Sequence, residues 1–189
     1  MNVPAVVLGT ANVCTNAVFR IRNLPDAPKS PLSTDPQNNQ QQLVQGAVQD
    51  LNTMLASPSF EAAVVGANFD PGQTGGKSPQ GIYDLMVSAS PIQLAVTLYT
   101  DLNPFSGNQG FEDDNSPGVA YGNLKAIKNN RGFLASLMLH EIMHILGFSH
   151  LDTKTYCVSV PYTMNRIYGE LASGLGLMTP GSRNPCSQP

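Results

Sequence analysis

The clearest structural signal in this sequence is the segment His140-Glu141-Ile142-Met143-His144-Ile145-Leu146-Gly147-Phe148-Ser149-His150, which has the pattern H-E-x-x-H-x-x-G-x-x-H. His140 and His144 are four residues apart. On a helix their side chains therefore lie on one face, about 6 Å apart along the axis. Two imidazoles arranged in this way can reach one metal ion.

The third histidine of the pattern requires the helix to end. His150 follows His144 by six residues, and a continuing helix would turn it through about 600°, onto the far side. Gly147 adopts the left-handed conformation at little cost and can reverse the chain there. We therefore predict that the helix stops at Gly147 and that His150 returns to the metal.

Glu141 and the number of histidines favour a catalytic site over a chance motif. Glu141 follows His140 directly, so it points beside the metal, where it suits the role of general base to a zinc-bound water. A short H-E-x-x-H string arises by chance, and a lone buried histidine is usually a core residue. Here all three histidines among 189 residues occupy ligand positions. We predict zinc ligands at His140, His144 and His150 and a catalytic role for Glu141.

These eleven residues resemble the zinc signature of the metzincin metallopeptidases, with some features similar to matrixins, adamalysins and leishmanolysin-like enzymes. The resemblance implies a zinc-dependent endopeptidase in which three imidazoles hold Zn²⁺ and a water takes the fourth position. Glu141 would accept a proton from that water as it attacks the peptide carbonyl, and return the proton to the departing amine. Several metzincins also carry structural calcium, and residues 101–116 are rich in Asp and Asn. Their spacing does not match an EF-hand loop, so a solvated loop is predicted there.

The expected elements follow an order close to that of the N-terminal half of metzincins. A half-exposed strand at 17–22 precedes a long amphipathic helix that begins at Pro36, with Thr34 or Asp35 as its cap, and runs to about Ala56. Further predicted elements are strands at 60–68, 82–88, 92–100 and 118–122, loops at 70–81 and 101–116, a buried zinc helix from Asn130 or Arg131 to Leu146, and a helix after Met164.

The fold class predicted from this order is α+β. We expect a metzincin-like, twisted mixed sheet of about five strands with a backing helix, a buried zinc-binding helix and a short C-terminal subdomain. The chain would form one catalytic domain over 1–189, with an upper subdomain of about 1–150 and a lower one of about 151–189. Metzincins also place a methionine in a tight turn beneath the zinc, and both Met164 and Met178 are candidates for it.

The position of residues Gly118 to Gly122 suggests where a substrate would bind. In metzincins the strand before the zinc helix is an antiparallel edge strand that pairs with extended substrate. An edge strand offers unpaired N–H and C=O groups, so a peptide can dock by strand addition. We predict that a protein or peptide substrate binds along this strand, and an ordinary edge strand is the alternative.

Composition excludes several other partners. The net charge is −3 and charged residues make up 12% of the chain, about half the usual share of roughly 25%. No basic cluster and no apolar run of ~18–20 residues is present in the sequence, which argues against nucleic acid and membrane partners. The first nine residues lack the basic region of a signal peptide. We expect a secreted, monomeric protein in its mature form, and an unexported chain is the alternative.

The three cysteines leave several arrangements open. Cys157 and Cys186 could form a disulfide that clips the C-terminal tail, and Cys14 could be a buried thiol or pair with Cys186. Cys14 could also hold the zinc in a latent zymogen. Two functional alternatives therefore accompany the peptidase hypothesis: a zinc-containing binding protein without proteolytic activity, and a latent form inhibited through Cys14.

Overall fold

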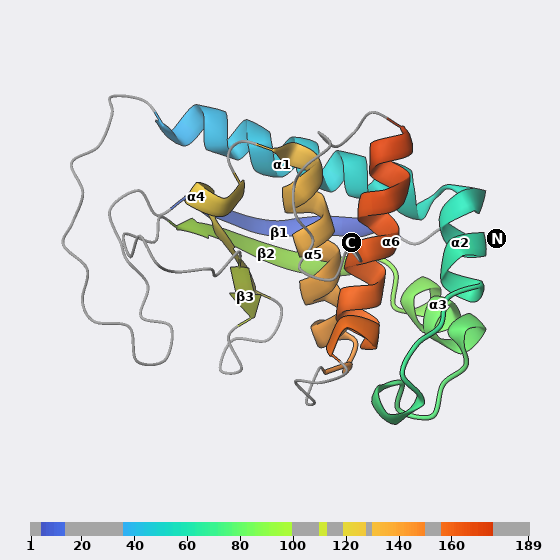
Figure 1. The fold of residues 1–189 in the computed structure, drawn as a ribbon. Coiled ribbons are helices and arrows are strands. Elements are labelled where there is room, and N and C mark those ends of the chain that lie inside the picture. Colours follow the sequence, from blue (N-terminus) through green and yellow to red (C-terminus); the bar gives the residue numbers. More distant parts are fainter. Residues whose placement is uncertain are drawn as a thin grey trace.

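The computed structural model describes residues 5–13, 36–99, 110–112, 119–127, 130–149 and 156–175, which are mostly helical (Figure 1). The elements in chain order are β1 (Val6–Val13), α1 (Pro36–Leu55), α2 (Pro58–Val65), α3 (Pro79–Ser88), β2 (Ile92–Tyr99), β3 (Gly110–Glu112), β4 (Val119–Asn123), α4 (Leu124–Ile127), α5 (Arg131–Ile145) and α6 (Val160–Gly174). Two short 3₁₀ turns, Pro71–Gln73 and Tyr156–Val158, complete the described part.

The described strands form one mixed sheet of four strands in the order β1-β2-β4-β3. β1 and β4 both pair in parallel with β2, and the short β3 pairs antiparallel with β4. The prediction of an α+β, metzincin-like fold with a twisted sheet of about five strands is therefore wrong. Helices dominate the described residues because two of the segments predicted to be strands are helical.

Residues 60–68, predicted as a strand, belong largely to α2. Ser57 caps this helix by accepting a hydrogen bond from the Phe60 N–H at 3.2 Å, and Pro58 occupies the first turn. Proline is favoured there because its missing N–H would have no helical partner. Phe60 and Val64 are four residues apart and both fully buried. The alanines that weaken a strand are good helix formers, so local preference and packing agree.

Residues 82–88, also predicted as a strand, lie in α3, which begins inside the predicted loop 70–81. Ser78 caps α3 by accepting from the Gly81 N–H at 3.1 Å, and Pro79 is the first helical residue. Ile82 and Met86 are fully buried at helical spacing. Burial of two such side chains stabilises this short helix against the core by about 3–6 kcal/mol.

The remaining strand predictions had mixed outcomes. The strand at 92–100 is confirmed as β2, and the strand at 118–122 is confirmed as β4. β4 lies between β2 and β3 in the described sheet, so its predicted position at an edge is wrong. β3 falls within the predicted loop 101–116, and β1 lies in residues that were not predicted to form a strand. The predicted strand at 17–22 lies outside the described residues, as do the calcium candidates at 101–108 and 113–115.

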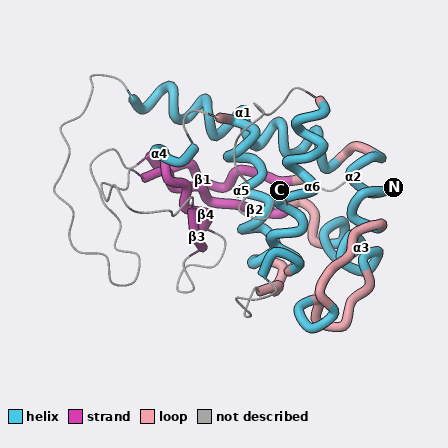
Figure 2. The backbone as a smooth tube through the Cα atoms, viewed as in Figure 1, coloured by secondary structure: helices cyan, strands magenta, loops and turns pink. Residues whose placement is uncertain are grey.

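The helices α1, α5 and α6 gather on one face of the sheet (Figures 1 and 2). The long helix α1 spans the residues predicted for it from Pro36 onward. Along β2 the side chains that face these helices are buried, whereas Gln93 between them is exposed. This alternation is expected of a strand with one face toward a core. The buried side chains of β2 are Ile92, Leu94, Val96 and Leu98.

A side chain from α1 forms hydrogen bonds with the backbone of Val6 on the side of β1 that does not pair with β2. The Val6 N–H donates to Asn52 Oδ1 at 2.7 Å, and Asn52 Nδ2 donates to the Val6 carbonyl at 3.0 Å. The amide of Asn52 thereby replaces the partner that a further strand would supply. Among the described helices, none is long and apolar enough to cross a membrane.

Candidate metal centre

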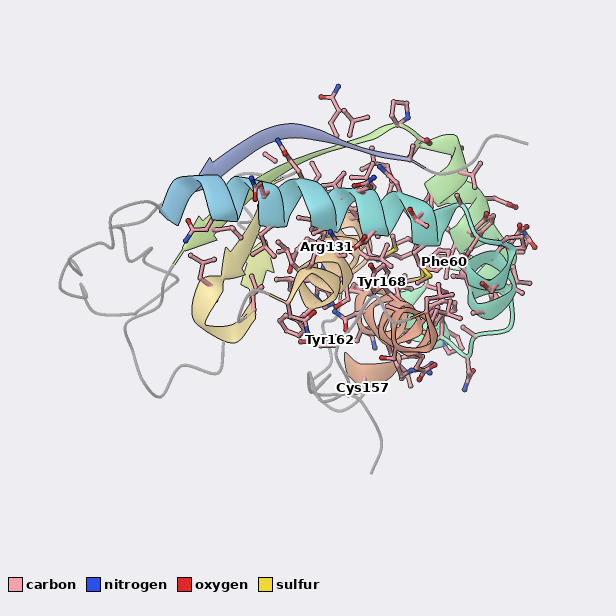
Figure 3. All side chains as sticks on the ribbon, turned by 90° about the horizontal axis from the view of Figure 1, so that it is seen from above. Phe60, Arg131, Cys157, Tyr162 and Tyr168 are labelled. Carbon is pink, nitrogen blue, oxygen red and sulfur yellow. The ribbon has the colours of Figure 1, made fainter. Side chains whose placement is uncertain are left out.

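The helix that carries the metal motif is fixed at its N-terminus, as predicted. Asn130 caps α5, with its side-chain oxygen accepting from the Phe133 N–H at 3.1 Å. Arg131 Nε lies 2.6 Å from Oδ2 of the buried Asp50 on α1. Figure 3 shows Arg131 where α1 passes over α5. A Cβ at Gly46 would overlap with the Arg131 side chain. The glycine therefore leaves room on α1 for Arg131 to reach Asp50.

The body of α5 is buried on all sides, which was also predicted. Every residue from Gly132 to Met143 is buried. The helix contacts α1, α6, β4 and β3. Gly122 in β4 leaves room for its neighbours, because a Cβ there would lie 3.4 Å from Leu134 Cδ1 of α5 and 2.9 Å from Ile127 Cδ1 of α4. Such enclosure on every side restricts the rotamers of the side chains that α5 carries.

His140 and His144 meet at the C-terminal end of α5. Their Nε2 atoms are 3.3 Å apart, and their ring centroids are 5.0 Å apart with an interplanar angle of 71°. His140 is 7% exposed and His144 is half-buried. The predicted convergence of these two imidazoles is confirmed. His150, the predicted third ligand, lies outside the described residues.

The chain itself fixes the tautomer of His144. Its Nδ1 lies 2.8 Å from the backbone carbonyl oxygen of Phe148. A carbonyl oxygen only accepts hydrogen bonds, so Nδ1 carries the proton. In the neutral ring Nε2 is then unprotonated and presents its lone pair toward His140. This is the arrangement in which a histidine binds a metal through Nε2 while its other nitrogen donates to an oxygen.

The separation of the two Nε2 atoms matches that expected for a shared zinc ion. With Zn–N distances of about 2.0–2.1 Å and a tetrahedral angle, two nitrogen ligands lie about 3.3–3.4 Å apart. The observed 3.3 Å fits this value, and it is longer than the common N–H hydrogen bond of about 2.9–3.0 Å. The described residues contain no group of three His, Cys, Asp or Glu side chains placed to hold a metal ion. The described residues supply two nitrogen donors, His140 and His144, and the third predicted donor, His150, lies outside them.

Gly147 ends α5 in the way that the sequence predicted. Its φ is +91°, in the left-handed region. The Gly147 N–H donates to the His144 carbonyl at 2.9 Å, and the Phe148 N–H donates to the Met143 carbonyl at 3.0 Å. These two bonds define a Schellman cap, which usually brings an apolar residue after the glycine back onto the helix. Phe148 is accordingly buried at 6% exposure.

We expect Gly147→Ala to lower the free energy of unfolding by about 1–2 kcal/mol, because an L-residue is strained in the left-handed region. A Cβ at Gly147 would meet nothing within 4 Å, so the cost is conformational. Gly174→Ala is the matched control, since its Cβ also meets nothing within 4 Å and its φ is not positive. That control should be neutral or slightly stabilising. Urea unfolding of both variants measures the difference, and equal effects would contradict the strain argument.

Glu141 lies one residue beyond His140, turned by about 100° around the helix. Its side chain is 2% exposed. Burial to this degree restricts the carboxyl group to few positions.

Residues of α6 that contact α5 near His140 could not be identified from the sequence. The ring of Tyr162 packs edge-to-face against the ring of His140, with centroids 4.6 Å apart and an interplanar angle of 80°. Asn165 Nδ2 donates to the Ser136 carbonyl on α5 at 3.1 Å. Both contacts join residues distant in sequence, and no local pattern marks them.

The methionine and cysteine predictions are only partly covered by the described residues. Met164 is buried inside α6, so it does not lie in a tight turn. Met178 lies outside the described residues. Cys157 forms a disulfide. The other two cysteines, Cys14 and Cys186, also lie outside the described part of the chain.

Comparisons with known proteins give no further guide to the chemistry of this site. No protein-family model, curated protein or solved structure matches the chain.

Proposed function

We propose that this protein is a zinc-dependent endopeptidase of the metzincin type, with Zn²⁺ bound by His140, His144 and His150. The observation that carries the proposal is the pair of Nε2 atoms 3.3 Å apart, together with the contact of His144 Nδ1 with the Phe148 carbonyl, which leaves Nε2 of the neutral ring unprotonated. The eleven-residue signature supports the assignment independently of the sheet, whose five predicted strands were not found.

In this proposal His140, His144 and His150 would hold a zinc ion, which would supply Lewis-acid chemistry toward a water and the scissile carbonyl. His140 and His144 bind as neutral imidazoles through Nε2, which leaves their Nδ1 atoms to donate hydrogen bonds. Glu141 accepts a proton from the attacking water and delivers it to the departing amine, so one carboxyl group serves as base and then as acid. The enclosure of Glu141 keeps bulk water from competing for that proton.

A purely structural zinc site would have less need of Glu141. Structural sites usually use four protein ligands, and no described cysteine or carboxylate completes a set of three with the two histidines. A buried carboxylate next to the first ligand is suited to accept a proton from a water held there. This favours a catalytic site over a zinc-containing binding protein.

We place the substrate along β3 instead of residues Gly118 to Gly122. β3 is the terminal antiparallel strand of the described sheet, and it contacts α5. Its outer side offers N–H and C=O groups to an extended peptide, which would add as a further strand. A protein or peptide substrate bound in this way would run close to α5, which β3 contacts.

The disulfide at Cys157 supports an extracellular location for this activity. Disulfides persist in oxidising compartments and are rare in the cytosol. A secreted peptidase also acts where its substrates are, away from the proteins of the cell that makes it.

The proposal is tested by metal analysis and proteolysis on one purified sample. We expect one zinc per chain after dialysis, cleavage of a denatured protein substrate, loss of cleavage with a chelator, and recovery on adding one equivalent of zinc. Bound zinc without any cleavage would indicate a binding protein. Absence of stoichiometric zinc would overturn the metal site. Cleavage that appears only after a thiol-modifying reagent would indicate a latent form held by Cys14.

A further inference from the structure

The ring of His140 contacts an aromatic side chain from a different helix. Tyr162, in the first turn of α6, lies edge-to-face against it at a centroid distance of 4.6 Å and an angle of 80°. Aromatic pairs prefer this geometry because the positive ring edge of one meets the negative face of the other. In Figure 3, Tyr162 lies beside α5 on the side away from α1.

The two histidines are oriented by different parts of the chain. His144 is fixed from within its own helix end, through the Phe148 carbonyl. His140 lies one turn earlier, where the backbone of α5 is fully used by helical hydrogen bonds. Its ring is flanked by His144 on one side and by Tyr162 on another. Through Tyr162, α6 therefore contributes to the orientation of the His140 ring.

We propose that Tyr162 is a positioning residue for the metal site, and that its aromatic ring holds the His140 imidazole with Nε2 toward the metal. This inference rests on the proposed zinc site but not on peptidase activity. An imidazole held in its binding orientation before the metal arrives loses less conformational freedom on coordination, which raises affinity. The role is assigned to the ring of Tyr162 because the observed contact is between rings.

A hydrogen bond from Asn165 helps to fix the position of α6, and with it Tyr162, along the axis of α5. Its Nδ2 donates to the Ser136 carbonyl at 3.1 Å. Ser136 is four residues before His140, so the same carbonyl accepts the His140 N–H within the helix. Asn165 and Tyr162 are three residues apart and lie on neighbouring turns of one face of α6. Together these two contacts align α6 with the turn of α5 that carries His140.

The test compares Tyr162→Leu with Tyr162→Phe by competition of each variant with a chromophoric zinc chelator. Loss of a residue that orients a ligand typically costs about 10–100-fold in metal affinity, and we expect this for Tyr162→Leu. Tyr162→Phe keeps the ring and should bind zinc within about twofold of the parent protein, since the edge-to-face contact is retained. Tyr83→Leu is the control, because Tyr83 is another half-buried tyrosine, on α3. It should leave zinc affinity unchanged.

A second measurement uses the metal-free protein, so it does not depend on zinc binding or on activity. Nuclear Overhauser contacts between the two rings should be present in the parent protein and in Tyr162→Phe. In Tyr162→Leu the His140 ring signals should shift or broaden as the ring samples other rotamers. Circular dichroism establishes that each variant is folded before either measurement.

Three results would overturn the proposal. They are unchanged zinc affinity in Tyr162→Leu, equal weakening by Tyr162→Leu and Tyr162→Phe, and absence of contacts between the two rings in the metal-free parent. A parent protein that binds zinc but cleaves nothing would refute the peptidase function and leave this inference standing. A parent protein that binds no zinc would refute both the metal site and the role of Tyr162 in it.

Discussion

Glu141→Gln is expected to lower kcat/KM for peptide hydrolysis by about 10²–10⁴-fold, the usual contribution of a general base, while zinc remains bound. Glutamine has nearly the size and shape of glutamate. Because the side chain is 2% exposed, this substitution avoids the cavity that alanine would leave. The effect should fall on kcat more than on KM, since Glu141 acts on the reacting groups and not on distant parts of the substrate.

The control for this prediction is Glu170→Gln. Glu170 is exposed on α6 and pairs with Arg166 at 2.8 Å, four residues earlier. Exposed pairs of this kind contribute little to stability, so the control should keep full activity. Metal content is measured on both variants by elemental analysis. If Glu141→Gln retained hydrolysis within about threefold of the parent, Glu141 would have no role as the base.

His150→Ala is expected to weaken zinc binding by roughly 10²–10³-fold. Zinc sites with four ligands bind with about 10–16 kcal/mol, so one ligand contributes roughly 3–4 kcal/mol, and each 1.4 kcal/mol is tenfold. The two described histidines provide a pair of donors only. A site left with two imidazoles should lose its metal on dialysis against a weak chelator.

The comparison for His150→Ala is His144→Ala, measured in the same chelator competition. His144 is one of the two imidazoles whose Nε2 atoms converge, so its loss sets the scale for removing a ligand. Similar losses for the two variants would establish His150 as the third ligand. Zinc retained in His150→Ala but lost in His144→Ala would show that another residue fills the third position.

The limits of α5 could be predicted closely because single residues at each end determine where the helix begins and stops. Asn130 is a good cap, and Gly147 can adopt a positive φ that other residues avoid. The spacing of the two histidines needs only helical geometry to bring them together. These effects act over a few neighbouring residues, so they do not depend on how the rest of the chain folds.

The errors in the predicted sheet arose because a Ser-Pro pair can follow the end of one helix or begin the next. Ser57-Pro58 lies just after the predicted end of the first helix at about Ala56, and the same two residues cap and begin α2. Ser78-Pro79 begins α3 in the same way. In both cases a buried pair at i and i+4 lies just beyond the proline, which is helical spacing. Pro36 begins α1 as predicted, and the predicted caps Thr34 and Asp35 lie outside the described residues.

Contacts between distant segments were beyond prediction. β3 has three residues and an unremarkable composition, and its pairing with β4 fixes it as a strand. Tyr162 reaches His140 only because α6 packs against α5. Nothing in the local sequence of α6 distinguishes this tyrosine from one that merely fills space.

The Schellman cap at Gly147 would couple the end of α5 to binding of the proposed zinc ion. Phe148 contributes its N–H to the Met143 carbonyl and its own carbonyl to His144 Nδ1. Fraying of the last turn would therefore release the imidazole as well as the backbone. By thermodynamic linkage, a cation that selects the closed end must slow that fraying. Hydrogen exchange at the Phe148 amide would then report occupancy of the site, although this amide touches no metal.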